Sequence, residues 1–76
     1  MDFNGFDTWL KDEKGMNERS ASDAASRLRR VLNITKEKEV TTETLDKLNS
    51  SKSFLSLSQC VKSQLRRAVA LYIEYK

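Results

Sequence analysis

The stretch that decides the fold is SASDAASRLRRVL, residues 20–32. Its small and apolar residues recur at helical spacing, and at about 100° per residue they fill an arc of roughly 120°. We therefore expect a helix from about Asn17 or Ser20 to Asn33. Ser20 and Asp23 resemble a capping box at its start. The residues on the arc are Ala21, Ala24, Ala25, Leu28, Val31 and Leu32.

Part of this stretch is repeated near the C-terminus. Residues 26–31 read SRLRRV and residues 63–68 read SQLRRA, 37 positions later. Helical repeat proteins generally need at least three units, and the sequence holds two short copies. The repetition therefore indicates two helices with one layout, in which Leu28 and Leu65 lie in the core and the arginines lie outside.

The N-terminal segment predicts a short amphipathic helix. Phe3, Phe6 and Leu10 share one face, with Trp9 beside them, and Gly15 is a natural residue to follow the helix end. Aromatic side chains at this spacing favour core packing over a platform for stacked bases.

Residues 34–42 predict a charged connection to a third helix. A threonine, Thr41 or Thr42, is expected to cap this short helix, which carries Leu45 and Leu48. Residues 49–53 then predict a polar loop, because serine, asparagine and lysine interrupt the apolar spacing there. Its far end is expected to be anchored by Phe54, Leu55 and Leu57.

The last helix is expected to begin at Ser56 or Ser58 and to reach the C-terminus. Cys60 is expected to be a partly buried small residue beside the core. The 76 residues then form one domain, and the fold class we predict is all-α, a compact four-helix bundle. The apolar face of the last helix holds Val61, Leu65, Ala68, Val69, Leu71, Tyr72 and Tyr75.

Composition excludes several kinds of protein. The chain has no histidine and one cysteine, so histidine acid–base chemistry, cysteine–histidine zinc sites and an internal disulfide are excluded. No glycine-rich phosphate loop or carboxylate dyad is found. Signal peptide and membrane-span patterns are absent from the sequence. We expect a cytoplasmic protein that is no enzyme and uses no cofactor or metal.

Positive charge gathers in two segments. Residues 19–36 hold five Lys or Arg against one Asp, a net +4, and residues 59–76 hold four against one Glu, a net +3. Each segment contains one copy of the repeated motif. The polar faces there combine arginine with serine and glutamine, which donate hydrogen bonds to phosphates and base edges. Nucleic acid is therefore the partner that these faces predict.

A protein-interaction module is the alternative. A small adaptor or inhibitor from a mobile element could present the same arginines to a protein partner with an acidic patch. Ile73, which falls among the polar positions, and the alanine-rich face of residues 21–25 are candidate contact surfaces. A steep fall of affinity with salt distinguishes DNA binding, because DNA releases counterions.

The sequence resembles one known family. Residues 6–10 (FDTWL), Lys14-Gly15-Met16-Asn17 and residues 28–31 (LRRV) are similar to motifs of the SAM-like, N-terminal core-binding domain of phage integrases and other tyrosine recombinases. Residues 60–72 look like the last helix of such domains. Ser20 stands where the family has threonine. The catalytic domain of the family is absent from these residues, which fits an excised domain or a free-standing protein.

The resemblance implies that the second and last predicted helices grip duplex DNA. No catalytic residue is carried over. Matched residue by residue, it implies DNA contacts from Arg19, Ser20, Ser22, Ser26, Arg30, Lys62, Ser63, Arg66 and Arg67.

Overall fold

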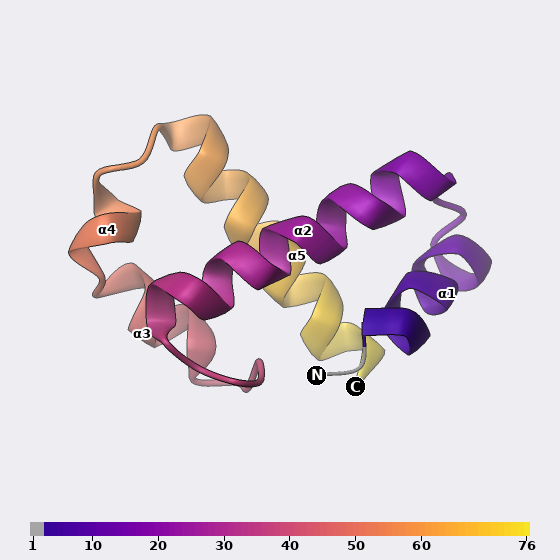
Figure 1. The fold of residues 1–76 in the computed structure, drawn as a ribbon, viewed down its shortest axis with the longest axis horizontal. Helices are drawn as coiled ribbons and strands as arrows, with labels where there is room; N and C mark the ends of the chain where they lie inside the picture. The colour runs from indigo at the N-terminus through magenta and orange to yellow at the C-terminus, as the bar shows by residue number, and fades with distance from the viewer. Residues whose placement is uncertain (1–2) are drawn as a thin grey trace.

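The computed structural model describes residues 3–76, and all regular structure in that range is helical. This confirms the all-α class, but the number of helices was wrong, because five are present. The extra helix lies where a polar loop was expected. The elements are α1 (Phe3–Glu13), α2 (Glu18–Thr35), α3 (Thr44–Asn49), α4 (Lys52–Leu55) and α5 (Gln59–Tyr75) (Figure 1).

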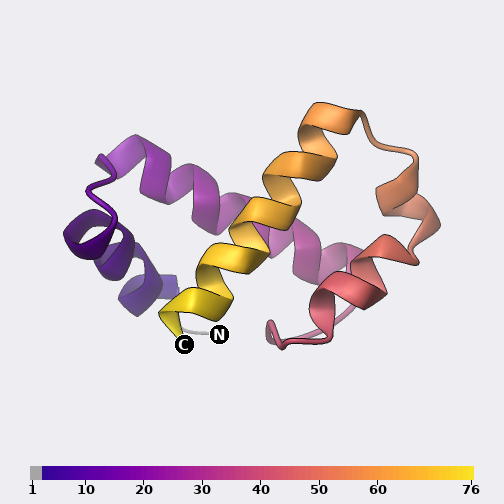
Figure 2. The ribbon, with the colours of Figure 1, turned by 180° about the vertical axis from the view of Figure 1, so that it is seen from behind.

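The two long helices, α2 and α5, cross one over the other and form the centre of the molecule (Figures 1 and 2). They share more contacts than any other pair of helices. The shortest dimension of the molecule is 16 Å, which leaves room for two layers of helices at the usual spacing of about 8–10 Å. Ala21 and Ala24 of α2 are 0% and 4% exposed, so this face of α2 is covered by the neighbouring helices.

An aromatic cluster joins α1 to α5, and α1 also packs against α2. The Phe6 ring lies 5.1 Å from the Tyr72 ring in an edge-on arrangement, and the Trp9 ring lies 5.5 Å from that of Tyr75. Phe6 and Tyr72 are fully buried, whereas Trp9 and Tyr75 are half-buried. The core role predicted for the N-terminal aromatic residues is therefore confirmed for Phe6.

Local signals set the ends of the long helices. Gly15, at φ +63°, adopts the left-handed conformation after α1, and Asn17 caps α2 by accepting a hydrogen bond from the Ser20 backbone N–H at 2.8 Å. The start at Asn17 is confirmed, and the capping box is wrong because Ser20 lies inside the helix. Ser58 caps α5, as predicted, through the Val61 backbone N–H.

Residues 41–60 differ from their prediction in three places, which are the cap of α3, Leu55 and Cys60. The position before α3 is Glu43, with no side-chain cap, whereas buried Thr44 accepts a hydrogen bond from the Thr41 backbone N–H at 2.8 Å. The threonine therefore supports the connection from within the helix. Leu55 is 52% exposed, because α4 turns Phe54 inward instead. Cys60 is exposed, since it lies about 100° around α5 from Val61.

Candidate nucleic-acid interface

Arginines and lysines differ in whether they form ion pairs with acidic side chains. Among residues 3–76, none of the six arginines forms an ion pair, and all six lie on α2 or α5. Four acidic side chains are thus engaged by lysines, and the arginines remain able to meet an external anion. The ion pairs of this range are Lys11–Asp7, Lys14–Glu74, Lys47–Glu37 and Lys76–Glu39.

The two copies of the repeated motif give equivalent residues equivalent environments. Leu28 and Leu65 are 0% and 1% exposed, as predicted. Two positions later, Arg30 and Arg67 are exposed. The motif therefore fixes one leucine in the core and one arginine in solvent on each long helix.

The first arginine of each pair is held against a phenylalanine. The guanidinium carbon of Arg29 lies 4.7 Å from the centroid of the Phe3 ring, and that of Arg66 lies 5.2 Å from the Phe54 ring. Arg66 also donates from Nε to Asn49 Oδ1 at 3.2 Å. These arginines tie a short helix to a long one, α1 to α2 and α4 to α5.

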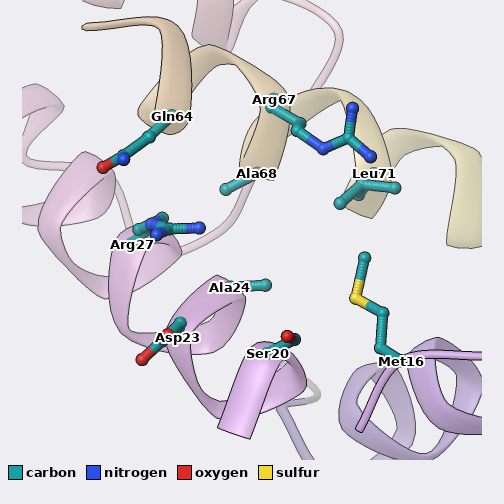
Figure 3. A pocket seen from close by; sticks show the side chains of 9 residues that line it. All are labelled: Met16, Ser20, Asp23, Ala24, Arg27, Gln64, Arg67, Ala68 and Leu71. Carbon is teal, nitrogen blue, oxygen red and sulfur yellow. The ribbon is translucent and has the colours of Figure 1, made fainter. Parts of the chain in front are cut away.

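A hollow of ≈ 230 Å³ lies between the N-terminal half of α2 and the middle of α5; we call it the α2–α5 groove (Figure 3). Arg27 stands on its α2 side, and Arg67 and Gln64 stand on its α5 side. Its floor includes Ala24 and Ala68, which are 4% and 2% exposed. Small side chains at the helix crossing thus leave the space that the polar residues border.

Two further polar residues of α2 border this groove. Ser20 and Asp23 line it near its α1 end, where Met16 stands opposite (Figure 3). Asp23 is four residues before Arg27, a spacing that often gives an ion pair on a helix, yet no ion pair joins them. Figure 3 shows the Asp23 carboxylate directed away from Met16 and Arg67.

The nine residues predicted to contact DNA do not share one surface. Ser20 and Arg67 border the α2–α5 groove. Ser22 instead lines a separate hollow between α1 and α2. Lys62 and Arg66 are half-buried, and Arg66 faces α3 and α4 through its contacts with Asn49 and Phe54. The remaining four are exposed on the outer sides of α2 and α5, and they are Arg19, Ser26, Arg30 and Ser63.

The prediction missed Arg27 and Gln64, which border the groove together. These two residues hold the same position in the two copies of the motif, directly before the buried leucine. That equivalence was the available signal. A single helical wheel places Arg27 on a flank and cannot show which neighbouring helix that flank meets.

Other kinds of site find little support in the described residues. In residues 3–76, no group of three or more Cys, Asp or Glu side chains is placed to hold a metal ion. No helix in that range is long and apolar enough to cross a membrane. Comparisons with protein-family models, with curated proteins and with solved structures gave no match.

Proposed function

We propose that this chain binds duplex DNA, mainly through the phosphate backbone, with the arginines of α2 and α5. The observation that carries the proposal is that the arginines form no ion pair among residues 3–76, whereas four lysines do. The family resemblance supports the same role for these two helices. Under this proposal the chain has a SAM-like bundle related to integrase core-binding domains.

The chemistry of arginine favours this partner. Its planar guanidinium donates two parallel hydrogen bonds to a phosphate and is less strongly hydrated than an ammonium group. Arg19, Arg30 and Arg67 are exposed, so a duplex can reach them. With a net charge of +3, the chain is expected to bind in the non-specific range of roughly 10⁻⁴–10⁻⁶ M at physiological salt.

The alternative, a protein-interaction module, has less free surface than its two candidate faces suggested. The alanine-rich face of α2 is buried, and Ile73 is half-buried and packs against the core. Among residues 3–76, Leu55 is the one large hydrophobic side chain that is exposed. A partner is therefore recognised by charge, which favours a polyanion.

Fluorescence anisotropy of a labelled duplex of about 20 base pairs, measured over a series of salt concentrations, tests the proposal. We expect binding that weakens steeply with salt. The variant Arg30→Gln should weaken binding and reduce the slope of log affinity against log salt by about 0.9 if Arg30 neutralises one phosphate.

The matched control is Lys38→Gln, which removes the same charge from an exposed residue between α2 and α3. It should leave the affinity and the slope near those of the unmodified chain. Absence of binding at low salt would refute the proposal and direct the search to a protein with an acidic patch. Equal losses in both variants would show that net charge alone, and no defined surface, drives binding.

A further inference from the structure

The α2–α5 groove brings two positive charges to one hollow. Arg27 reaches it from α2 and Arg67 from α5, and neither forms an ion pair within residues 3–76. Asp23 lies at the edge, with its carboxylate directed away from Arg67 (Figure 3). Two like charges beside one space repel each other, and an anion between them removes that repulsion.

The groove also offers neutral hydrogen-bond donors and enough space for a phosphate group. The Gln64 amide and the Ser20 hydroxyl also line the groove, and both groups donate hydrogen bonds to phosphate oxygens. The volume of ≈ 230 Å³ is several times the roughly 30 Å³ that one water molecule occupies in the liquid. A phosphate group therefore fits with some of its water.

We infer that the α2–α5 groove is a binding site for one phosphate group, held jointly by Arg27 and Arg67 with Gln64 and Ser20 as neutral donors. The inference deepens the proposed function, on which it rests, by assigning one backbone phosphate of the duplex to this groove. Arg67 is exposed, so its side chain is free to change rotamer when a phosphate binds, as interface side chains commonly do. The alanine floor keeps the phosphate close to the helix crossing.

NMR tests the site directly. Amide and arginine side-chain N–H signals are recorded while inorganic phosphate, a mononucleotide or a short duplex is added. We expect the largest shifts at Arg27, Gln64 and Arg67 with all three ligands. The duplex should produce these shifts at a lower concentration than phosphate or the mononucleotide. Shifts confined to the outer residues Arg19 and Arg30 would overturn the inference.

A matched pair of variants separates the groove from general charge effects. Gln64→Glu and Gln59→Glu make the same substitution and add the same negative charge on α5, inside and outside the groove. Gln64→Glu should weaken duplex binding about tenfold, the loss expected for one charged hydrogen-bonded contact. Gln59→Glu should weaken it much less. Equal effects would overturn the inference.

The double variant Arg27→Gln/Arg67→Gln asks whether one phosphate is shared. A shared phosphate predicts that the salt slope of duplex binding falls by about 0.9, and two separate phosphates predict about twice that value, which would overturn the shared site. If the unmodified chain binds no duplex, the proposed function fails on its own. The groove is then judged by the shifts with phosphate and mononucleotide: their presence supports it, and their absence overturns it.

Discussion

At the scale of single residues, two neighbouring arginines on α5 have different tasks. Arg66 is half-buried, stacks on Phe54 and donates a hydrogen bond to Asn49. Arg67 is exposed and borders the groove. The first position therefore stabilises the fold, and the second is available to a ligand.

This difference predicts that alanine substitution changes stability much more at Arg66 than at Arg67. Arg66→Ala should lower the free energy of unfolding by about 1–2 kcal/mol, because a cation–π contact and a hydrogen bond are lost. Arg67→Ala should change it by less than about 0.5 kcal/mol, as expected for an exposed residue without partners in the described chain. Urea unfolding followed by circular dichroism measures both. Equal losses would contradict the assignment of Arg66 to the fold.

At the scale of elements, polar groups fasten the connection after α2 to α3. The buried Thr44 hydroxyl donates to Glu37 Oε1 at 3.1 Å, and Lys47 Nζ lies 3.0 Å from Glu37 Oε2. The hydrogen bond from Lys47, helped by that from Thr44, holds the pKa of Glu37 below its usual value. The hydrogen bond between Lys47 and Glu37 also raises the pKa of Lys47.

The lowered pKa of Glu37 predicts an acid-sensitive connection. A carboxyl whose pKa is lower in the folded state stabilises the fold above its unfolded-state pKa of about 4.5, and this contribution disappears as the pH falls through the folded-state value. The free energy of unfolding should therefore decrease as the pH falls below about 5. Glu37→Gln should reduce that decrease.

Urea unfolding at several pH values measures this effect, with Glu43→Gln as the control. Glu43 is an exposed acid of the same connection and forms no ion pair in the described range. Its variant should follow the pH dependence of the unmodified chain. Parallel curves for all three proteins would show that the Glu37 contacts contribute nothing.

The sequence predicted elements well where one strong local signal acted. The apolar spacing of residues 20–32 and the cap at Ser58 located both long helices. Helix α4 was missed because four residues carry no helical period, and Lys52 and Ser53 resemble a loop. It is held by burial of Phe54, a contact between distant segments that local propensity does not contain.

At the scale of the whole molecule, the crossing of α2 and α5 decides which residues meet. Helical wheels separated inward from outward residues, but they did not show which part of α2 faces α1 and which part faces α5. Ser20 and Ser22, both predicted to contact DNA, consequently line different hollows. The groove pair Arg27 and Gln64 became visible only after the helices were placed.

The aromatic cluster predicts that α1 unfolds together with the rest of the molecule. A chain of 76 residues is expected to have a free energy of unfolding of only about 4–11 kcal/mol, and Phe6 contacts both Trp9 and the buried Tyr72. Trp9 is the single tryptophan, so its fluorescence reports on α1, while circular dichroism reports on all helices. The two urea transitions should coincide.

Substitution within the cluster tests this cooperativity. Phe6→Leu keeps an apolar side chain and should lower the free energy of unfolding by about 1–2 kcal/mol. Both transitions should then move together to lower urea concentration. Phe54→Leu, in the core at α4, should do the same, because a single cooperative unit transmits a loss at either end to both signals. If Phe6→Leu instead moved the Trp9 transition alone, α1 would be a separately unfolding helix. The contacts of Phe6 would then stabilise only the docking of α1, and they would not stabilise the crossing of α2 and α5.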